Sequence, residues 1–530
     1  MQIAFTILFI LLTTGLLSAI SGKILQILQL SGYKPRGLFN WIRQSKGDYL
    51  IRYFGVGFFS FAAMLVYVAC FGEYPAARYF GYLFLVGFCL LFLFLNARER
   101  QKTPLKNTAR IVRLRCLLAV LYAVESFFLL WLGSLFFAGY ALLGILPALV
   151  PYNAVLADCL MLPVEHLNNY GYKMKAMRKL DDRPELIRIG ITGSYGKTTE
   201  KAIAACILSV RYKVCASPLS YNTPMGIAKV VNNELSDEDE VFIAEMGARN
   251  VGDIKELAEI VNPNFGILTT IGNQHLESFG SRENIRKTKY ELIENLAPAG
   301  FALFNGDSPD NIELYEKTTG AKILTGAAGV PHAAAYYDNV TVGGTGTSFD
   351  FHYAGNTTRF ATKLLGKHIP GLITLGAALG IQLGIAPEKA AEAIAGLEPV
   401  PHRLELIEGK GGMIIIDDAY NSNIEGAVNA LAVLAEFDDK YKVIVTPGLV
   451  ELGGEETEMN FRLGAEAGKV CDSVIFVGPL ASVLRDGALS TGMDGDSVFC
   501  TDDLYAGVAI LRKLPGEKAV LFENDLPDNY

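Results

Sequence analysis

Ile187-Arg-Ile-Gly-Ile-Thr-Gly-Ser-Tyr-Gly-Lys-Thr-Thr199 joins an apolar run typical of a β-strand to a glycine-bearing turn, and a helix-forming segment, Glu200 to Val210, follows it. Glycines let backbone N–H groups turn inward, and the start of a helix adds a positive dipole. Lys197 is placed to reach the outer phosphates of a nucleotide, and Thr198 to hold Mg²⁺. The stretch therefore predicts a phosphate-binding loop between a strand and a helix.

The loop is a variant of the common pattern G-x-x-x-x-G-K-[ST], because the residue five places before Gly196 is Ile191. It fits T-G-x-x-G-K-T-T instead. The plainer alternative is a glycine-rich turn without a ligand, but strand, glycines, Lys-Thr and helix occur here in the required order. The candidate phosphate-binding residues are Gly193, Ser194, Tyr195, Gly196, Lys197, Thr198 and Thr199.

Composition bounds the class of protein. The 530 residues are enough for about three domains. The mean hydropathy of +0.29 is high for a soluble protein, and the apolar excess lies before residue 165. The net charge of −8 gives no reason to propose nucleic acid as a partner. The eight cysteines form no CxxC pair, which favours reduced thiols over a disulfide framework.

The N-terminal part predicts an α-helical membrane domain over residues 1–165. Each apolar segment has close to the roughly 20 residues that cross the hydrocarbon of a bilayer. The first segment lacks a basic region before it and is followed by more spans, so we interpret it as a retained helix and not a signal peptide. The five predicted spans are near residues 3–21, 53–72, 79–96, 116–137 and 139–162.

Loop charges predict the orientation. Basic residues gather in the first and third loops and after the last span, and the positive-inside rule places these stretches in the cytosol, with the N-terminus outside. The third loop either sets topology alone or also contacts anionic headgroups. Glu125, inside the fourth span, is either functional or an acid at a helix contact. The basic residues are Lys23, Lys34, Arg36, Arg43, Lys46, Arg98, Arg100, Lys102, Lys106, Arg110, Arg113, Arg115, Lys173, Lys175, Arg178 and Lys179.

Beyond a basic linker at 166–184, strand-like and helix-like runs alternate, which is typical of α/β domains with parallel sheets. We expect an ATP-binding domain over 185–365, with a small antiparallel insert from Ala335 to Lys363, and a Rossmann-like domain over 366–530. The predicted strands are Leu186–Ile191, Val241–Glu245, Phe265–Thr270, Ala302–Asn305, Met413–Asp417, Lys442–Thr446, Ser473–Val477, Ser497–Cys500 and Ala519–Phe522.

Polar residues follow several of these strands. Glu245 ends an apolar strand, where an α/β sheet presents a metal-binding carboxylate beside a phosphate loop. His275 lies between a strand end and a Gly-bounded loop, and Lys289 starts a helix. Asp417-Asp-Ala-Tyr-Asn-Ser-Asn423 follows a strand of the last domain. Taken singly, each of these is more often a surface, turn or core residue.

Together these motifs resemble the Mur ligase family, most closely its MurF type, which adds D-alanyl-D-alanine to a peptidoglycan precursor. The resemblance covers about residues 185–525. It rests on motifs in family order: the loop, Tyr221-Asn-Thr-Pro-Met-Gly-Ile227, Ala244-Glu-Met-Gly-Ala248, His275-Leu-Glu-Ser-Phe-Gly-Ser281, Lys287-Thr-Lys-Tyr-Glu291, Gly366-Lys-His368, Pro401-His-Arg-Leu404 and Asp417–Asn423.

The resemblance implies that ATP converts a carboxylate to an acyl phosphate, which an amine then attacks to give an amide. It implies Mg²⁺ held by Thr198 and Glu245, a second metal near His275, and a carbamylated Lys289. Lys197, His275 and Lys289 would be catalytic. The resemblance further assigns Asn222 to the central site, Arg403 and Asp418 to the nucleotide, and Tyr420, Asn421 and Asn423 to the amino substrate.

Three departures from the family pattern bear on the substrate. Two asparagines near the adenine are replaced by Ile369 and Leu372. Membrane helices stand in place of the N-terminal domain that binds the UDP-sugar. The end of the chain, Leu521 to Tyr530, lacks the usual basic Lys-Gly-Ser motif. ATP chemistry is thus predicted more firmly than the substrate.

Several functions stay open. The first is a membrane-anchored, ATP-dependent amide ligase acting on a cell-envelope precursor at the cytosolic face, with a lipid-linked or membrane-delivered carboxylate and an amino acid or dipeptide as partners. A second is a ligase whose substrate is a soluble UDP-MurNAc-peptide and whose helices serve only for localisation or as a scaffold for partner enzymes. A third is an amidating or poly-amino-acid ligase. A fourth is an ATP-driven transporter or sensor, and a degenerate, non-catalytic ligase is a further alternative.

Overall fold

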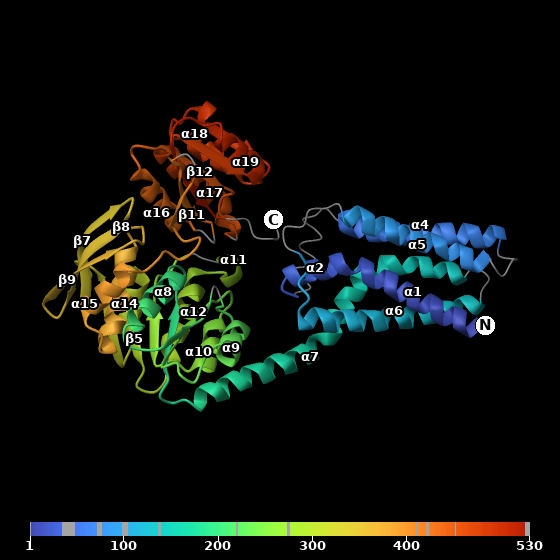
Figure 1. Cartoon of the computed structure of the whole chain (residues 1–530), viewed down its shortest axis with the longest axis horizontal. Coiled ribbons are helices and arrows are strands. Elements are labelled where there is room, and N and C mark those ends of the chain that lie inside the picture. Colours follow the sequence, from blue (N-terminus) through green and yellow to red (C-terminus); the bar gives the residue numbers. More distant parts are fainter. Residues whose placement is uncertain are drawn as a thin grey trace. The chain divides into compact units, whose positions relative to one another are not determined.

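A computed structural model describes residues 2–33, 48–71, 77–97, 104–135, 139–218, 221–272, 276–409, 412–419, 423–450 and 452–524. The chain divides into two units, Met1–Asn169 and Tyr170–Leu526. The first is built of helices and the second around two β-sheets (Figure 1). The predicted division into an apolar helical part and an α/β part is therefore seen in the fold.

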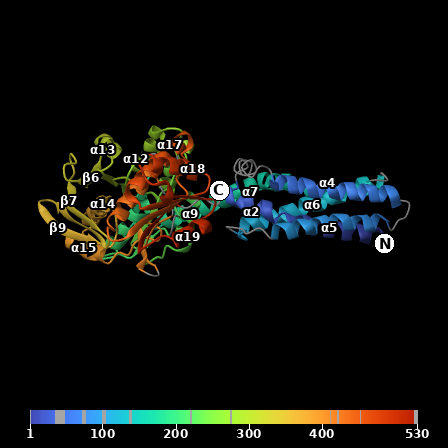
Figure 2. The ribbon, with the colours of Figure 1, turned by 90° about the horizontal axis from the view of Figure 1, so that it is seen from above.

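The first unit is a bundle of long apolar helices. Helix α4 packs on α5 and α1 packs on α6, and the bundle buries a leucine-rich interior. Figure 2 shows α4, α5 and α6 running in nearly the same direction along this unit. Gly144 lets a 3₁₀ turn approach α4 closely, because a Cβ there would lie 2.4 Å from the backbone nitrogen of Phe61. The elements are α1 (Gln2–Ile20), α2 (Gly22–Leu30), α4 (Asp48–Phe71), α5 (Ala77–Ala97), α6 (Ala109–Leu135), η1 (Gly139–Ile145) and α7 (Leu146–Asp181).

Polar side chains inside the bundle are paired across helices. The hydroxyls of Ser21 and Tyr122 lie 2.7 Å apart. The Asn153 amide of α7 donates to the Glu125 carboxylate of α6 at 2.9 Å. Glu125 therefore lies at a helix–helix contact, in line with the simpler of its two sequence interpretations.

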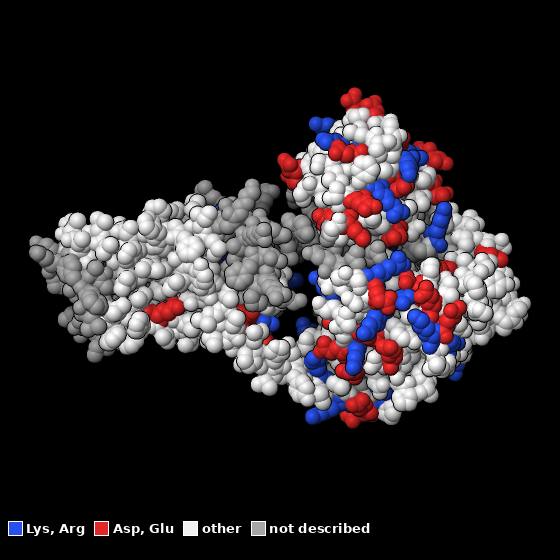
Figure 3. All heavy atoms as spheres, turned by 180° about the vertical axis from the view of Figure 1, so that it is seen from behind, with Lys and Arg blue, Asp and Glu red and all other residues white. Residues whose placement is uncertain are grey.

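By length and composition, three helices of the described residues are able to cross a membrane: Leu50–Phe71, Ala109–Leu132 and Tyr140–Asp181. A fourth span results if Thr6–Ile20 and Gly22–Leu30, which meet at a 41° bend, form one crossing. The remaining predicted span, near 79–96, is helical in α5, but its apolar part, Phe80–Asn96, is shorter. The count of five spans stays a prediction. The surface of this unit carries few charges compared with the second unit (Figure 3).

Helix α7 continues through most of the predicted basic linker and ends at Asp181. Its last turns present Tyr172, Ala176 and Leu180 to the core of the second unit at helical spacing. This spacing explains why the segment is helical and not an extended linker. Further back, Asp158 and Glu165 of α7 pair with arginines of α6 at 2.8 and 2.7 Å.

The second unit begins with a nine-stranded sheet of order β2-β3-β1-β4-β5-β6-β7-β8-β9. Strands up to β7 run parallel, and β7, β8 and β9 form the antiparallel extension predicted for 335–363. The strands are β1 (Ile187–Thr192), β2 (Val214–Ala216), β3 (Val241–Glu245), β4 (Phe265–Leu268), β5 (Phe301–Asn305), β6 (Ala321–Ala327), β7 (Ala335–Gly343), β8 (Gly346–Tyr353) and β9 (Asn356–Thr362).

Helices cover both faces of this sheet (Figure 1). Helices α8, α14 and α15 share one buried cluster with the strands, and α9, α10, α12 and α13 share the other. The helices are α8 (Lys197–Leu208), α9 (Pro224–Asn233), α10 (Asp253–Val261), α11 (Leu276–Phe279), α12 (Arg282–Glu294), α13 (Pro309–Lys317), α14 (Ile369–Gln382) and α15 (Pro387–Ala395).

A second sheet has the order β10-β11-β15-β12-β13-β14, parallel except for β10. Helices α16, α17 and α18 pack on one face, and α19 on the other. The elements are β10 (Glu405–Glu408), β11 (Ile414–Asp418), α16 (Ile424–Ala435), β12 (Tyr441–Thr446), η3 (Gly453–Glu455), α17 (Glu456–Val470), β13 (Ser473–Val477), α18 (Ala481–Leu489), η4 (Gly495–Ser497), β14 (Val498–Thr501), α19 (Leu504–Leu511) and β15 (Lys518–Glu523).

Candidate active site

The loop between β1 and α8 makes a tight turn that requires glycine at two positions. Gly193 and Gly196 have φ angles of 155° and 79°, which favour glycine. A Cβ at Gly193 would lie 2.0 Å from the Thr269 hydroxyl, so the close approach of β4 also requires glycine. Helix α8 begins at Lys197, three residues before the predicted start. The loop backbone thus faces the N-terminus of a helix, as the sequence predicted.

Lys197 lies over the loop. Its Nζ donates to the carbonyl oxygens of Gly193 at 2.8 Å and Ser194 at 2.9 Å. Burial lowers the pKa of Lys197 to about 8, the carboxylate of Glu245 raises this pKa, and the guanidinium of Arg403 lowers it. Lys197 therefore lies within electrostatic reach of both residues, although they come from different sheets.

Glu245 is the centre of the site. It ends β3 beside β1, with Ile191 as its register partner, and is 1% exposed. Its Oε2 accepts hydrogen bonds from the Thr198 hydroxyl at 3.1 Å and the Lys201 ammonium at 2.9 Å. Its Oε1 accepts one from the Asn222 amide at 3.2 Å. The structure thus brings together three residues that the sequence singled out.

Lys201 was not predicted. It is 6% exposed and is the buried counter-ion of Glu245. Two signals were available: Lys201 follows Lys197 by four residues, which places both on one face of α8, and a buried strand-end glutamate needs a positive partner. Its neighbour Glu200 was also missed. That side chain is fully buried, neither carboxylate oxygen has a hydrogen-bond partner among the described residues, and burial raises its pKa well above the ordinary value.

Lys289 of α12 is 3% exposed. Burial lowers its pKa well below the ordinary value, and the positive charge of Lys197 lowers it further, whereas Asp253 and Glu291 raise it. Its Nζ lies 6.0 Å from the ring centroid of Phe279. Desolvation thus favours the neutral amine, the form that reacts as a nucleophile.

The remaining loop residues fix its shape. The Ser194 hydroxyl accepts a hydrogen bond from the Gly272 N–H and donates to the Gly272 carbonyl, each at 3.0 Å. Tyr195 bridges to Thr270, and burial raises the pKa of its phenol. Thr199 lies in the first turn of α8.

The second sheet contributes charged residues near the start of β10 and the end of β11. The Asp418 carboxylate accepts the Leu404 N–H at 3.2 Å. Burial raises the pKa of Asp418 to about 6, against the lowering effect of Arg403. Asn423 caps α16, because its side-chain oxygen accepts the Gly426 N–H at 2.9 Å. His275, Tyr420 and Asn421 lie outside the described residues.

The two apolar departures lie beside the loop. Ile369 and Leu372, in the first turn of α14, are 3% and 2% exposed. The Leu372 side chain would be 3.1 Å from a Cβ at Gly196. Apolar packing thus occupies the positions where the family resemblance implied amide contacts.

Two family models match the chain. The Mur ligase middle domain matches residues 191–370, and the Mur ligase, glutamate ligase domain matches 402–522. Together they span more than half of the sequence. Both sheets fall within these matches, apart from the first four residues of β1 and the last residue of β15.

Curated relatives of known name cover the same region. A UDP-N-acetylmuramoyl-tripeptide--D-alanyl-D-alanine ligase of Bacillus subtilis is 33% identical over 305 residues, covering 57% of this chain and 65% of that protein. The Escherichia coli ligase of the same name is 28% identical over 335 residues, covering 63% and 72%. This chain therefore spans slightly less than two thirds of the Bacillus subtilis relative.

Solved structures show the same fold. MurF from Acinetobacter baumannii has a TM-score of 0.62 at 22% identity, covering 67% of this chain and 77% of that chain. MurF ligase from Thermotoga maritima in complex with ADP has a TM-score of 0.60 at 24% identity, covering 67% and 80%. At these identities the similarity concerns the arrangement of the two sheets and their helices.

Proposed function

Because this chain belongs to the Mur ligase family, we propose that it is a membrane-anchored, ATP-dependent ligase that forms an amide bond on a cell-envelope precursor, as MurF-type enzymes do. The observation that carries this proposal is the convergence of Thr198 and Asn222 on Glu245, directly beside the loop that holds Lys197. A buried carboxylate beside a phosphate-binding loop is suited to a nucleotide-bound cation.

The proposed reaction has two steps. The γ-phosphoryl group of ATP passes to a substrate carboxylate, which gives an acyl phosphate and ADP. An amine then attacks the acyl carbon and loses a proton, and the tetrahedral intermediate expels inorganic phosphate to leave the amide. Negative charge builds up on phosphoryl oxygens in both steps, so catalysis rests on positioning and on cations.

Lys197 and the loop N–H groups bind the β- and γ-phosphates in this proposal. Lys197 exchanges its two loop carbonyl partners for phosphate oxygens, and its charge is matched to theirs.

The oxygen donors of Thr198 and Glu245 fit Mg²⁺, which prefers hard oxygen ligands, and the ammonium of Lys201 shows that this carboxylate already attracts a cation. Bound there, Mg²⁺ would neutralise charge on the phosphates. Asn222 orients the carboxylate from the other oxygen. We assign a second metal to the region of His275, near the acyl acceptor.

Lys289 is the proposed site of carbamylation. A neutral amine adds CO₂ to form an N–C bond and releases one proton, which turns a neutral side chain into an anion. Burial and the neighbouring charge of Lys197 favour the neutral amine that this step requires. The carbamate anion would balance the metal charges, whereas an ammonium would repel them.

The second sheet completes the site. We assign Arg403 and Asp418 to the nucleotide, since Arg403 already acts electrostatically on both Lys197 and Asp418. Tyr420, Asn421 and Asn423 are assigned to the amino substrate, an amino acid or dipeptide. Asn423 lies at the N-cap of α16, where its side-chain oxygen accepts the Gly426 N–H.

We propose that the helices before β1 anchor the enzyme in the cell membrane, with the N-terminus outside and the ligase part in the cytosol. These helices precede the family match, at the place in the chain where MurF-type enzymes carry their UDP-sugar domain. A membrane-delivered, lipid-linked carboxylate would explain such an anchor.

The test uses purified full-length protein in detergent with ATP and Mg²⁺. Phosphate release is followed while UDP-MurNAc-peptides, lipid-linked muropeptides, D-alanyl-D-alanine and other amines are added singly and in pairs. We expect release only when acid and amine are both present, with a product mass equal to their sum minus water. Steady hydrolysis without any acceptor would contradict the ligase. Repeated additions of one amino acid, or use of ammonia, would favour the poly-amino-acid or amidating alternative.

A further inference from the structure

A basic groove lies on the second unit, in the segment of the chain directly before β1 and the loop of the candidate active site. It has a volume of about 630 Å³ and is lined by the last turns of α7 and by Asp237, in the turn after α9. Asp237 precedes β3, so the groove is at the edge of the sheet where β3 begins, whereas Glu245 is at its other end. The lining residues are Tyr170, Gly171, Met174, Lys175, Arg178, Lys179, Asp182, Arg183 and Asp237.

Contacts on the opposite side of α7 fix the orientation of the helix that lines the groove. The Tyr172 hydroxyl donates to Asn233 at 3.1 Å, and the Asn232 amide donates to the Tyr172 carbonyl at 3.0 Å. Ala176 and Leu180 are fully buried in the cluster to which α9 and α10 also contribute. This packing fixes the rotation of α7, so the face that carries Lys175 and Arg178 is turned to solvent.

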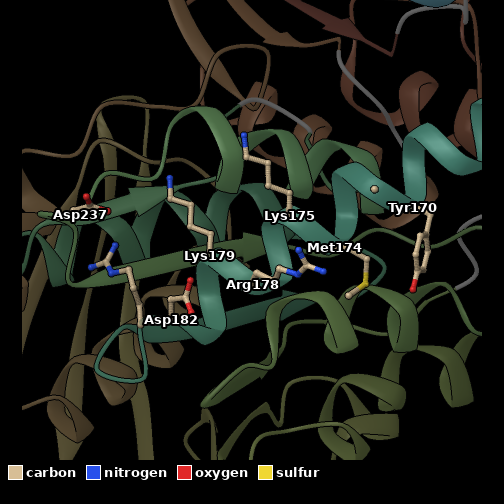
Figure 4. A pocket seen from close by; sticks show the side chains of 9 residues that line it. Tyr170, Met174, Lys175, Arg178, Lys179, Asp182 and Asp237 are labelled. Atoms are coloured by element: carbon tan, nitrogen blue, oxygen red, sulfur yellow. The ribbon is translucent and has the colours of Figure 1, made fainter.

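The groove carries excess positive charge. Two of its cations are held at the wall by backbone carbonyls: Lys179 donates to Leu235 at 2.5 Å, and Arg183 to Ser236 at 2.7 Å. Lys175 and Arg178 are exposed, and their side chains have no ion-pair or hydrogen-bond partner among the described residues. Among the lining residues, four cations thus face two carboxylates, and Arg183 also pairs with Glu185 at 3.2 Å. Lys175 and Lys179 project from the same side of α7, and Arg178 lies beside Met174 (Figure 4).

The part of α7 that precedes the groove carries an exposed apolar stripe. Exposed apolar side chains recur from Leu149 through Leu156 and Leu160 to Leu167. At about 1.5 Å per residue this stripe covers about 28 Å, close to the roughly 30 Å of bilayer hydrocarbon. Tyr170, 62% exposed, follows within a turn, at the depth where tyrosine favours the headgroup layer.

The cations come next along the helix. The Arg178 guanidinium turns toward Met174, on the side of Tyr170 (Figure 4). Lys175 lies closer to Tyr170 along the helix, and its long, flexible side chain can extend its charge to a headgroup. The helix dipole explains basic residues in the last turn of α7, but Lys175 lies before that turn.

We propose that this groove binds the phosphate of an anionic phospholipid headgroup, with Lys175 and Arg178 as the principal ligands and Tyr170 and Met174 against the glycerol and upper acyl chain. The proposal rests on the membrane anchoring proposed above. It adds a lipid-selective contact outside the proposed membrane-spanning helices, through which the ligase part would bind a negatively charged membrane.

The experiment uses full-length protein in nanodiscs of phosphatidylcholine doped with phosphatidylglycerol. Tyr170 is replaced by the photo-crosslinking residue p-benzoylphenylalanine, and mass spectrometry identifies the attached lipid. A second protein carries the probe at Leu156, within the apolar stripe. We expect crosslinks to lipid at both positions, and about fivefold enrichment of phosphatidylglycerol over its bulk fraction at residue 170 only.

The double variant Lys175→Gln/Arg178→Gln should lose this enrichment. The matched control Lys469→Gln/Arg485→Gln removes an exposed lysine and an exposed arginine from the second sheet's helices and should keep it. Lipid crosslinks at residue 156 with none, or with bulk composition, at residue 170 would overturn the groove and leave the anchor intact. The absence of lipid crosslinks at both positions would overturn the anchor itself.

Discussion

Lys201 and Glu245 form a buried ion pair of 2.9 Å beside the loop between β1 and α8. The same carboxylate oxygen accepts the Thr198 hydroxyl. One glutamate therefore links the helix that follows the loop to the strand beside it. A cation that binds between Thr198 and Glu245 meets a carboxylate whose orientation is already fixed.

Removing Lys201 should destabilise the fold. Lys201→Met leaves Glu245 charged and buried without its partner, so we expect the free energy of unfolding to fall by about 3 kcal/mol. Urea titration of wild type and variant measures this. The double variant Lys201→Met/Glu245→Leu should recover most of the loss, because no uncompensated charge remains. Equal stability of Lys201→Met and wild type would show that the pair contributes little.

Lys197→Ala should abolish turnover, with a loss in kcat of at least about a hundredfold, because charge on the transferred phosphoryl group is no longer neutralised. Phosphate release with saturating acid and amine measures this. The control is Lys213→Ala, an exposed lysine at the other end of the sheet, which should retain activity. A Lys197→Ala enzyme with normal kcat would remove the loop from the mechanism.

Lys289→Ala should lower activity by about a hundredfold or more, because the proposed carbamate can no longer form. A short carboxylic acid such as acetate should restore part of it by supplying an anion in the vacated space. Removing bicarbonate should lower wild-type activity but leave the variant unaffected. Normal activity of Lys289→Ala in bicarbonate-free buffer would contradict the carbamate.

The raised pKa of Asp418 predicts that both the free energy of unfolding and kcat/KM depend on pH in the acidic range. Burial raises this pKa from its ordinary value of 3.8 to about 6, so the folded state binds more protons than the unfolded state between these values. The unfolding free energy contributed by this group is therefore fully present below about pH 4 and falls as pH rises toward 6. Asp418→Asn should flatten stability curves in that window. If ionised Asp418 serves the nucleotide, kcat/KM should rise through pH 6 in wild type only.

Glu200 predicts a stabilising substitution. Its buried carboxyl has no hydrogen-bond partner among the described residues, and its raised pKa means that the folded state favours the protonated form. At neutral pH the unfolded state is ionised, so this site costs stability as pH rises above the ordinary value of 4.5. Glu200→Leu should raise the melting temperature by several degrees near pH 8, corresponding to about 1 kcal/mol, and less near pH 5. If the difference in melting temperature between Glu200→Leu and wild type is the same at pH 5 and pH 8, Glu200 does not have a raised pKa in the folded state.

Much of the α/β fold followed from local pattern. The nine predicted strands are present in the structure with ends displaced by at most two residues, because each is an apolar run bounded by turn residues. The strands that were missed, β2, β6 and β10, are short or less apolar. Their pairing depends on neighbours distant in sequence, which periodicity does not reveal.

The site was predicted in part. Thr198, Asn222 and Glu245 do meet, because the loop and the ends of parallel strands lie at one edge of the sheet. Lys201 and Glu200 were missed because their importance comes from burial, which depends on how α14 packs over α8. The roles assigned to the site residues remain proposals, including those of His275, Tyr420 and Asn421.

The two hydrogen bonds of Lys197 to the carbonyls of Gly193 and Ser194 have a consequence for ligand choice. A ligand that enters the loop must replace both bonds, and only a group with strong acceptor oxygens repays that exchange. The uncharged hydroxyls of adenosine are weak acceptors, whereas a terminal phosphate supplies charged oxygens. We therefore expect adenosine to bind poorly, and we expect ADP, which keeps its β-phosphate, to compete with ATP for the loop.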